Sequence, residues 1–309
     1  MSEFILHHYP PSPVSEKIRT GFGLKALTWR SVEQNRLPDR PELFAMTGGY
    51  RRIPVMQIGA DIYCDTQCIL REIEKRAPEP TFFPNQSVGL PFALSRWTDG
   101  ELFDAAFRIA LAPVADTMPP EFVNDRARLY IGPNADLGKE LADLPHTLAQ
   151  FRAQIGWLEA RLQTGRLYIL GDKPGMPDLL AWYIFWFVDT RYEKAKAFFS
   201  EFPALNLWAD RMAAIGHGIS TPMTPAEALD IAKATDPTTE TQADPRDPQG
   251  LKPGMRASVG PLTDSGEMAV EGIIRATNPD TIALTIDNPL CGQIAVHFPR
   301  VGYRVTILA

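Results

Sequence analysis

Short apolar runs and helical stripes alternate over residues 1–83 of the chain. Continuous or alternating apolar runs predict strands, whereas apolar residues three or four positions apart predict helices. Val14, Ile18 and Phe22 show the helical spacing. The expected elements are a strand at 3–7, a helix that contains these three residues, a strand at 26–32, a helix at 42–46, strands at 53–58 and 61–64, and a helix at 66–76. This β-α-β-α-β-β-α order predicts a small α/β domain whose first two strands are parallel.

The pattern becomes helical after residue 87, and strand signals vanish. Apolar stripes predict helices at 91–111, 144–162, 177–188, 205–215 and 225–234. We therefore expect an all-helical domain at 87–235. A stretch rich in Thr, Asp, Pro and Gln follows at 236–253 and is typical of a linker.

The last part of the chain, residues 254–309, carries β-branched runs separated by turn signals. Five strands are expected, at 256–259, 270–276, 281–286, 294–298 and 303–307. Short strands with tight turns predict a small antiparallel β-roll or barrel. The fold class is thus a multidomain chain in which an α/β domain precedes an all-α domain and a small β domain.

Composition narrows the kinds of partner and the compartment. The chain has 309 residues, 45% of them hydrophobic and 22% charged, as in ordinary globular proteins. A net charge of -6 argues against nucleic acid as a partner, because duplex binding needs a basic face. No apolar run reaches the roughly 20 residues that span a bilayer, so no membrane is expected as a partner. Three cysteines without a disulfide framework, and no recognisable signal peptide, favour the cytoplasm.

Three short motifs stand where strands meet helices or turns. Ser12 opens the first helix, where backbone N–H groups and the helix dipole favour negative charge. Pro54 opens a strand, a position that tolerates proline. Asp65 and Thr66 stand at a strand-to-helix junction, a second place suited to an anion. Ser12 and Thr66 would also serve as plain helix caps.

Three segments resemble the landmarks of glutathione S-transferases in their order and spacing. They are Ser12 to Arg19, the Ile53-Pro54-Val55 step and Asp65-Thr66. The resemblance spans residues 3–235 and implies a thioredoxin-like glutathione-binding domain at 1–83, followed by the helical domain of that family. It implies a cis Ile53–Pro54 bond that turns the Ile53 backbone toward the cysteinyl unit of glutathione. Thr66 would hold the γ-glutamyl carboxylate, and Asp65 would order the site or meet the ligand's ammonium group. The family more often carries Glu-Ser at this last pair.

The resemblance gives Ser12 as the catalytic hydroxyl that favours the thiolate of glutathione, with Tyr9 as the rival hydroxyl. Ser15 stands where redox relatives carry a second cysteine, so dithiol chemistry is excluded. Arg52 is a candidate for a glutathione carboxylate, because arginine pairs with carboxylates through two parallel bonds. Its neighbour Arg51 is a similar candidate, and Arg40 and Gln67 are weaker ones.

A further segment of the helical domain resembles the family's capping segment before a central buried helix. Asp178 matches its buried acidic residue, whereas Gly175 stands where the family usually has Ser or Thr. This segment is a folding signature and not a catalytic one. No histidine spacing suggests a metal site, and none is expected.

The leading hypothesis is a cytoplasmic glutathione-dependent transferase whose thiolate attacks an apolar electrophilic small molecule in detoxification. Glutathione is expected as co-substrate, and the resemblance implies a homodimer. The alternative is a non-catalytic binding or interaction module of the same fold, with the C-terminal strands as its interaction surface. From the sequence, those strands could bind a partner, or close over the active site or the dimer, and ordinary packing of a β domain is the default expectation.

Overall fold

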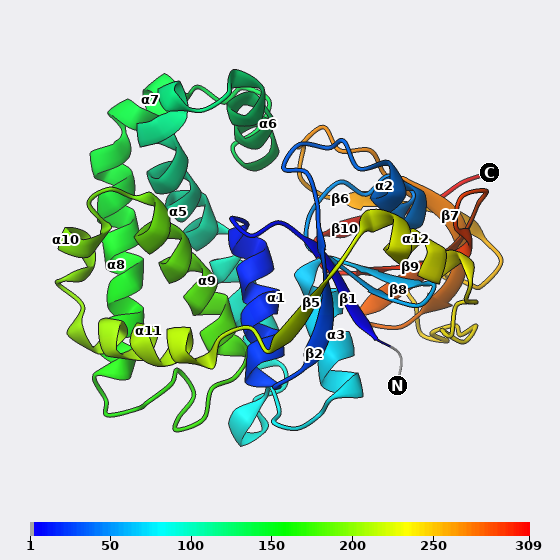
Figure 1. The fold of residues 1–309 in the computed structure, drawn as a ribbon, viewed down its shortest axis with the longest axis horizontal. Helices are drawn as coiled ribbons and strands as arrows, with labels where there is room; N and C mark the ends of the chain where they lie inside the picture. The colour runs from blue at the N-terminus through cyan, green and yellow to red at the C-terminus, as the bar shows by residue number, and fades with distance from the viewer. Residues whose placement is uncertain (1–2) are drawn as a thin grey trace. The chain divides into compact units, whose positions relative to one another are not determined.

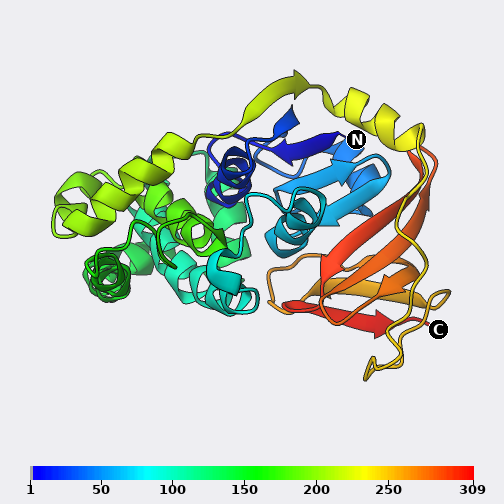
Figure 2. The same cartoon turned by 90° about the horizontal axis from the view of Figure 1, so that it is seen from below.

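The computed structural model describes residues 3–309 and divides the chain into two compact units (Figures 1 and 2). The first unit comprises the chain up to Ser15, Thr28–Ile73 and Ile219–Ala309. The second comprises Glu16–Leu27 and Glu74–Gly218. The strands belong to the first unit and most of the helices to the second.

The first unit is built on strands from both ends of the chain. They are β1 (Phe4–His8), β2 (Thr28–Glu33), β3 (Val55–Ile58), β4 (Asp61–Cys64), β5 (Ile219–Met223), β6 (Arg256–Pro261), β7 (Val270–Thr277), β8 (Thr281–Asn288), β9 (Gly292–Pro299) and β10 (Tyr303–Ile307). Its helices are α2 (Pro41–Thr47), most of α3 (Thr66–Arg76) and α12 (Pro225–Lys233). The first seven elements follow the predicted order, with α1 (Pro13–Leu24) as the first helix.

Within residues 3–309, the ten strands form one sheet in the order β10-β6-β7-β8-β9-β4-β3-β1-β2-β5. β1 and β2 are parallel, and β3 and β4 run antiparallel at their side, which is the thioredoxin-like arrangement. β9 then pairs in parallel with β4, with Asp61 opposite Ala295. The five strands predicted for the C-terminal region are all present, and they continue the N-terminal sheet.

The five C-terminal strands pair antiparallel with one another, as expected, but this set of strands extends the N-terminal sheet and is not separate from it. Without β9, β4 would be an edge strand with unpaired backbone groups, and proteins cover such edges. The apolar side chains of both parts also share one core, in which Val55 and Ile62 lie with Val296 and Phe298. The C-terminal strands are therefore an integral part of the first unit.

The structure also draws the segment boundaries differently from our predicted domains. Residues 219–235, which we placed at the end of the helical domain, form β5 and α12 of the first unit. β5 pairs in parallel with β2, and α12 buries Ala228 and Ala232 in the core of this unit. The predicted linker is tied to the sheet as well, because Thr238 and Thr239 donate hydrogen bonds to the carboxylate of Asp61.

The second unit is helical. It contains most of α1 together with α4 (Leu90–Thr98), α5 (Glu101–Leu111), α6 (Pro120–Tyr130), α7 (Leu137–Ala142), α8 (Leu144–Leu162), α9 (Met176–Arg191), α10 (Ala195–Phe199) and α11 (Pro203–Ile215). Short 3₁₀ turns lie at Pro84–Gln86 and Ala112–Thr117. The helix that we predicted at 91–111 is divided into α4 and α5 by a break at Gly100. Only glycine fits at this break, because a Cβ there would lie 2.6 Å from the carbonyl oxygen of Arg96.

The central helix of this unit is α9, which is buried on nearly every side. Asp178 in its first turn is fully buried, as the resemblance implies. Its carboxylate accepts hydrogen bonds from the backbone N–H groups of Ile169 and Gly175, at 2.9 and 3.0 Å, and from the indole of Trp208 at 2.8 Å. A Cβ at Gly175 would lie 2.5 Å from Pro84 and 2.8 Å from the carbonyl oxygen of Phe82, which explains the glycine.

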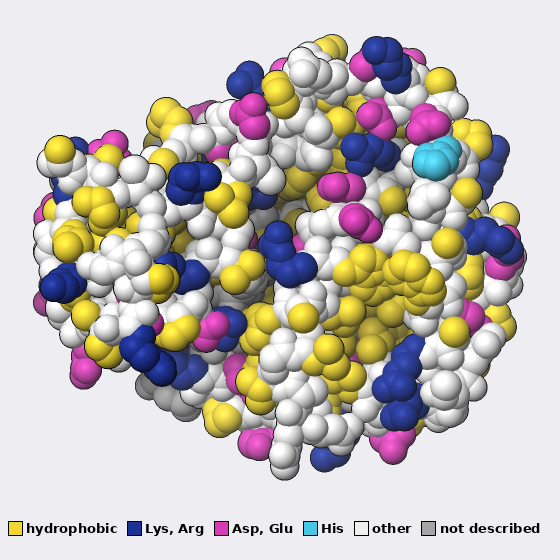
Figure 3. Space-filling model, turned by 180° about the vertical axis from the view of Figure 1, so that it is seen from behind, with side chains coloured by type: hydrophobic (Ala, Val, Ile, Leu, Met, Phe, Trp, Pro, Cys, Tyr) yellow, Lys and Arg dark blue, Asp and Glu magenta, His cyan; other side chains and the backbone are white. Residues whose placement is uncertain are grey.

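The surface carries mixed charge. On the face drawn in Figure 3, Lys and Arg side chains are spread among acidic and hydrophobic ones and do not gather into one basic area. Among the described residues, no helix has both the length and the apolar character that crossing a bilayer requires.

Candidate functional site

The candidate site lies in the first unit, at one edge of the β1, β3 and β4 part of the sheet. His7, Val55 and Cys64 stand opposite one another across these three strands. β4 ends at this row, β1 ends one residue beyond it at His8, and β3 begins there, because β3 runs antiparallel to both. The three landmarks follow or precede the strands by a few residues, so the topology directs all three to the same edge.

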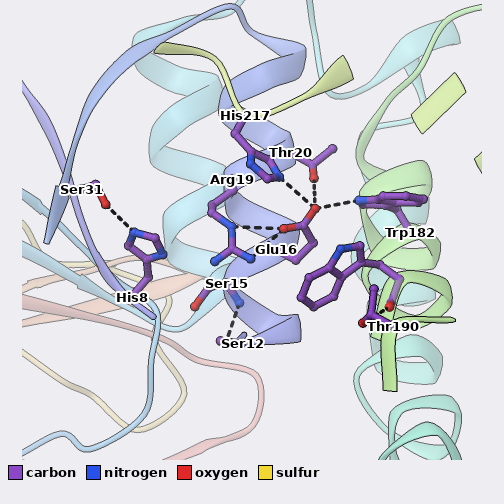
Figure 4. A network of polar contacts seen from close by, with 11 residues as sticks. His8, Ser12, Ser15, Glu16, Arg19, Thr20, Ser31, Trp182, Thr190 and His217 are labelled. Atoms are coloured by element: carbon purple, nitrogen blue, oxygen red, sulfur yellow. Dashed lines mark hydrogen bonds and ion pairs between the residues drawn. The ribbon is translucent and has the colours of Figure 1, made fainter. Parts of the chain in front are cut away.

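Ser12 is the N-cap of α1 and is 2% exposed. Its Oγ accepts a hydrogen bond from the backbone N–H of Ser15 at 3.2 Å (Figure 4). A hydroxyl that accepts in this way still carries one hydrogen that it can donate. The N-cap reading and the catalytic reading of Ser12 are therefore compatible in one geometry. Pro13 at the first helical position adds no N–H that would need a partner.

Tyr9, the rival hydroxyl, follows β1 directly. Its backbone carbonyl accepts a hydrogen bond from the N–H of Ser12 at 3.0 Å, which closes the turn before α1. The ring is partly buried and packs against the core of the first unit. Tyr9 therefore contributes its backbone to the turn before α1 and its ring to the packing of the first unit.

The Ile53–Pro54 peptide bond is cis, as the resemblance implies. β3 begins at Val55, so Ile53 and Pro54 precede the strand and do not lie in it, contrary to our expected boundary. Ile53 thus stands outside the ladder that β3 forms with β1 and β4. Its side chain is buried, and its backbone is at the open end of the sheet.

Asp65 occupies the sharp turn between β4 and α3, with a positive φ of 71°. Aspartate adopts this left-handed region more readily than most residues. Its Oδ1 accepts a hydrogen bond from the backbone N–H of Gln67 at 2.9 Å, so Asp65 caps α3. Thr66 is the first residue of α3 and is 6% exposed. The junction has the geometry expected of an anion site at a helix N-terminus.

The C-terminal region, residues 254–309, contacts three of the predicted side chains through a loop, a turn and a strand, and the sequence did not reveal this. Arg52 forms a two-pronged ion pair with Glu267, with Nε at 2.8 Å and Nη2 at 2.5 Å from its oxygens. Asp65 accepts a hydrogen bond from the hydroxyl of Tyr303 at 3.2 Å. Gln67 donates its side-chain N–H to the carbonyl of Val301 at 3.3 Å. The C-terminal region therefore contacts residues of the candidate site.

These contacts and burial shift the pKa values of several groups at the candidate site. Burial alone would lower the pKa of Arg52, but its bonds to Glu267 raise it well above the usual range. The same pair keeps the pKa of Glu267 below its ordinary value although burial opposes this. Burial and the nearby Asp65 raise the pKa of Tyr303, so its hydroxyl stays protonated and donates to that carboxylate. Burial also raises the pKa of the Cys64 thiol, which excludes it as a thiolate nucleophile at neutral pH.

Arg40, a weaker candidate, has another role. Arg40 is 4% exposed, and its guanidinium donates to the backbone carbonyls of Asn35, Arg36 and Arg51. It therefore holds together the loop that precedes β3. Within residues 3–309, no group of three or more His, Cys, Asp or Glu side chains is arranged to hold a metal ion.

Comparisons with known proteins identify the class of protein. Residues 6–81 match the family model of the glutathione S-transferase N-terminal domain, and residues 139–211 match that of the C-terminal domain. A solved GST-like protein from Pseudomonas syringae is 31% identical, with a TM-score of 0.82, over 100% of both chains. The chain therefore belongs to the glutathione S-transferase family.

The same comparison covers the C-terminal strands, since the match to the Pseudomonas syringae protein runs over the whole of both chains. A glutathione transferase from Phanerochaete chrysosporium matches 70% of this chain and 98% of its own, with 18% identity and a TM-score of 0.58. A glutathione S-transferase from Methylobacterium radiotolerans, solved with glutathione sulfonate, matches 72% and 98%, with 17% identity and a TM-score of 0.50. No curated protein matches the chain in sequence.

Proposed function

We propose that this protein is a glutathione-dependent transferase that binds glutathione at the edge formed by β1, β3 and β4. The observation that carries the proposal is the meeting of three landmarks at that edge, namely Ser12, the cis Ile53–Pro54 step and Asp65-Thr66. The related Methylobacterium radiotolerans structure, which holds glutathione sulfonate, supports a ligand of this class.

In the proposed complex, the tripeptide adds to the sheet as a short strand. The Ile53 backbone pairs with the cysteinyl unit, since it lies outside the existing ladder. Thr66 and the N-terminus of α3 receive the γ-glutamyl carboxylate, and Asp65 meets the ammonium group. Arg52 then takes the remaining glycine carboxylate, because a guanidinium and a carboxylate match in shape and charge.

This placement brings the ligand's sulfur to the N-terminus of α1. The Ser12 hydroxyl donates a hydrogen bond to the sulfur, and the helix dipole favours the thiolate over the thiol. The thiolate then attacks an electrophilic carbon, so that a sulfur–carbon bond forms while the bond to the leaving group breaks. The proton of the thiol passes to solvent. Conjugation, dehalogenation and ether cleavage all fit this step.

From family membership we further propose that the electrophile is an apolar small molecule and that the protein is a homodimer. We propose the cytoplasm as its compartment, where glutathione is abundant, and detoxification as its role.

Replacement of Ser12 tests the catalytic part. Ser12→Ala removes a hydrogen bond to a charged sulfur, so turnover with a reactive electrophile should fall roughly 10- to 100-fold. Thr224→Ala is the matched control, because Thr224 also caps a helix through its side chain but lies at the start of α12. Turnover of the control should stay within about twofold of the parent protein. Equal activity in Ser12→Ala and the parent would refute the role of this hydroxyl.

One observation favours the alternative, a non-catalytic module of the same fold. Arg52 and Asp65 already bind two side chains of the C-terminal region, Glu267 and Tyr303. Glutathione binding without turnover of any electrophile in a broad panel, unchanged by Ser12→Ala, would decide for this alternative.

A further inference from the structure

The carboxylate of Glu267 lies on Arg52 in the way that a ligand carboxylate would. Both carboxylate oxygens lie within 3.0 Å of Nε, and one also accepts from Nη2. This is the two-pronged geometry by which arginine recognises carboxylates. The face of Arg52 that would bind the ligand is thus already occupied by the chain itself.

Glu267 belongs to a loop at 262–269 that connects β6 and β7 and forms no helix or strand. The loop is mostly exposed, with Leu262 at 59% and Met268 at 83%. The side chain of Glu267, in contrast, is only 4% exposed and also accepts a hydrogen bond from the hydroxyl of Ser265. Glu267 is therefore a buried anchor of an otherwise exposed loop, which also contacts the rest of the unit through a backbone hydrogen bond from Leu262 to Gly302 and through Thr263, whose hydroxyl lies 3.5 Å from Nη2 of Arg52.

The contact at Asp65 is held in a different way. Tyr303 is the first residue of β10, and its backbone pairs with Pro261 in the β10–β6 ladder. The Tyr303 ring also packs on Phe298, with 5.8 Å between ring centroids. Displacement of the loop would leave this strand-held contact in place, so the two contacts can be separated by experiment.

We propose that Glu267 is an intrachain competitor for the carboxylate subsite of Arg52, so that glutathione binds fully only when its glycine carboxylate displaces Glu267. The inference rests on the proposed function, which assigns that subsite to the glycine carboxylate. The physical reason is charge: a second carboxylate brought to the same face of Arg52 would lie beside Glu267, and like charges at that separation repel. The loop at 262–269 thereby sets the affinity of the site and its preference among glutathione derivatives.

Calorimetric titration of Glu267→Gln tests the competition. Glutamine keeps the shape of the side chain but loses its charge, so the variant should bind glutathione about tenfold more tightly than the parent protein, the loss of one charge-assisted contact. The matched control is Glu271→Gln on β7, whose carboxylate pairs with Arg256 at the surface and is 56% exposed. The control should bind like the parent. Ser265→Ala, which only loosens the hold on Glu267, should give a smaller gain than Glu267→Gln.

A second ligand identifies the competing group. Glutathione esterified at its glycine carboxylate has no charge to place on Arg52. Glu267→Gln should therefore change its affinity by less than about twofold, because the ester gains little from a free guanidinium.

The outcomes separate the inference from the proposed function. Equal glutathione affinity in the parent and Glu267→Gln, or weaker affinity in the variant, would overturn the competition while glutathione binding itself stands. A weaker affinity would mean that Glu267 positions Arg52 for the ligand. An equal gain for glutathione and for the ester would also overturn the inference, since the glycine carboxylate would not be the competing group. If no folded variant binds glutathione at millimolar concentration, the proposed function fails together with the inference.

Discussion

Glu16, in the first turn of α1, has a buried carboxylate that accepts several hydrogen bonds. It is 2% exposed, and its two oxygens accept from the guanidinium of Arg19, the hydroxyl of Thr20, the indole of Trp182 and the imidazole of His217 (Figure 4). Replacement by glutamine preserves the size of the side chain but removes its charge. We expect the variant to be markedly less stable at neutral pH.

The magnitude follows from the pKa of Glu16. Burial would raise it, but the bonds and charges of His217 and Arg19 lower it from 4.5 to about 2. This difference corresponds to about 3 kcal/mol of stability when the group is ionised. Because the folded-state pKa is the lower one, the stabilisation is present above pH 4.5 and is lost as the pH falls toward 2. At pH 3 it should amount to about 1.4 kcal/mol.

Urea unfolding followed by tryptophan fluorescence measures this effect. Glu16→Gln should lower the free energy of unfolding by about 3 kcal/mol at pH 7 and by roughly half as much at pH 3. Glu201→Gln is the control, because its ion pair with Arg152 is solvent-exposed and should contribute little to stability. A penalty for Glu16→Gln below about 1 kcal/mol at pH 7, or one that does not change with pH, would refute the reasoning.

Two further predictions concern packing and are checked by thermal unfolding. Phe298→Ala should destabilise the first unit by about 3–5 kcal/mol, because the ring is fully buried and packs on Tyr50 and Tyr303. Leu290→Ala, at an exposed position, is the control and should have little effect, and an equally small effect of Phe298→Ala would mean that the C-terminal strands are not part of that core. Gly175→Ser introduces a residue that is usual in the family at this position. It should lower the free energy of unfolding by about 1–3 kcal/mol, because its Cβ would clash with Pro84 and the backbone of Phe82. An unchanged melting temperature would contradict this prediction.

The landmarks of the candidate site could be predicted from the sequence because each is local. Ser12 and Thr66 stand next to the helices that they open, and Pro54 stands next to the strand that it precedes. Strand pairing then brings these local signals to one edge of the sheet. The order of the first seven elements followed from the same short-range pattern, with boundaries that differ by one or two residues.

The contacts from the C-terminal region could not be predicted in this way. Glu267 is 215 positions from Arg52, and Tyr303 is 238 positions from Asp65. In sequence, Glu267 stands in a polar loop and has the pattern of any solvated charge. Its buried position depends on β9 pairing with β4, and no short-range signal encodes a pairing between distant strands.

β5 was missed for a related reason. Four of its five residues are exposed, and it contains Pro222, so neither alternation nor an apolar run marks it as a strand. It lies at the edge of the sheet, where its parallel pairing with β2 supplies the stabilisation. The helices α6, α7 and α10, which we also missed, lack the long apolar stripe by which the long helices of the second unit were predicted.

The most direct test of the account is a crystal structure of the protein grown or soaked with glutathione. We predict that the cysteinyl unit pairs with the backbone of Ile53 and that the sulfur lies within about 3.5 Å of the Ser12 hydroxyl. The γ-glutamyl carboxylate should lie at Thr66. Glutathione bound elsewhere on the chain, or with its sulfur away from Ser12, would contradict the account.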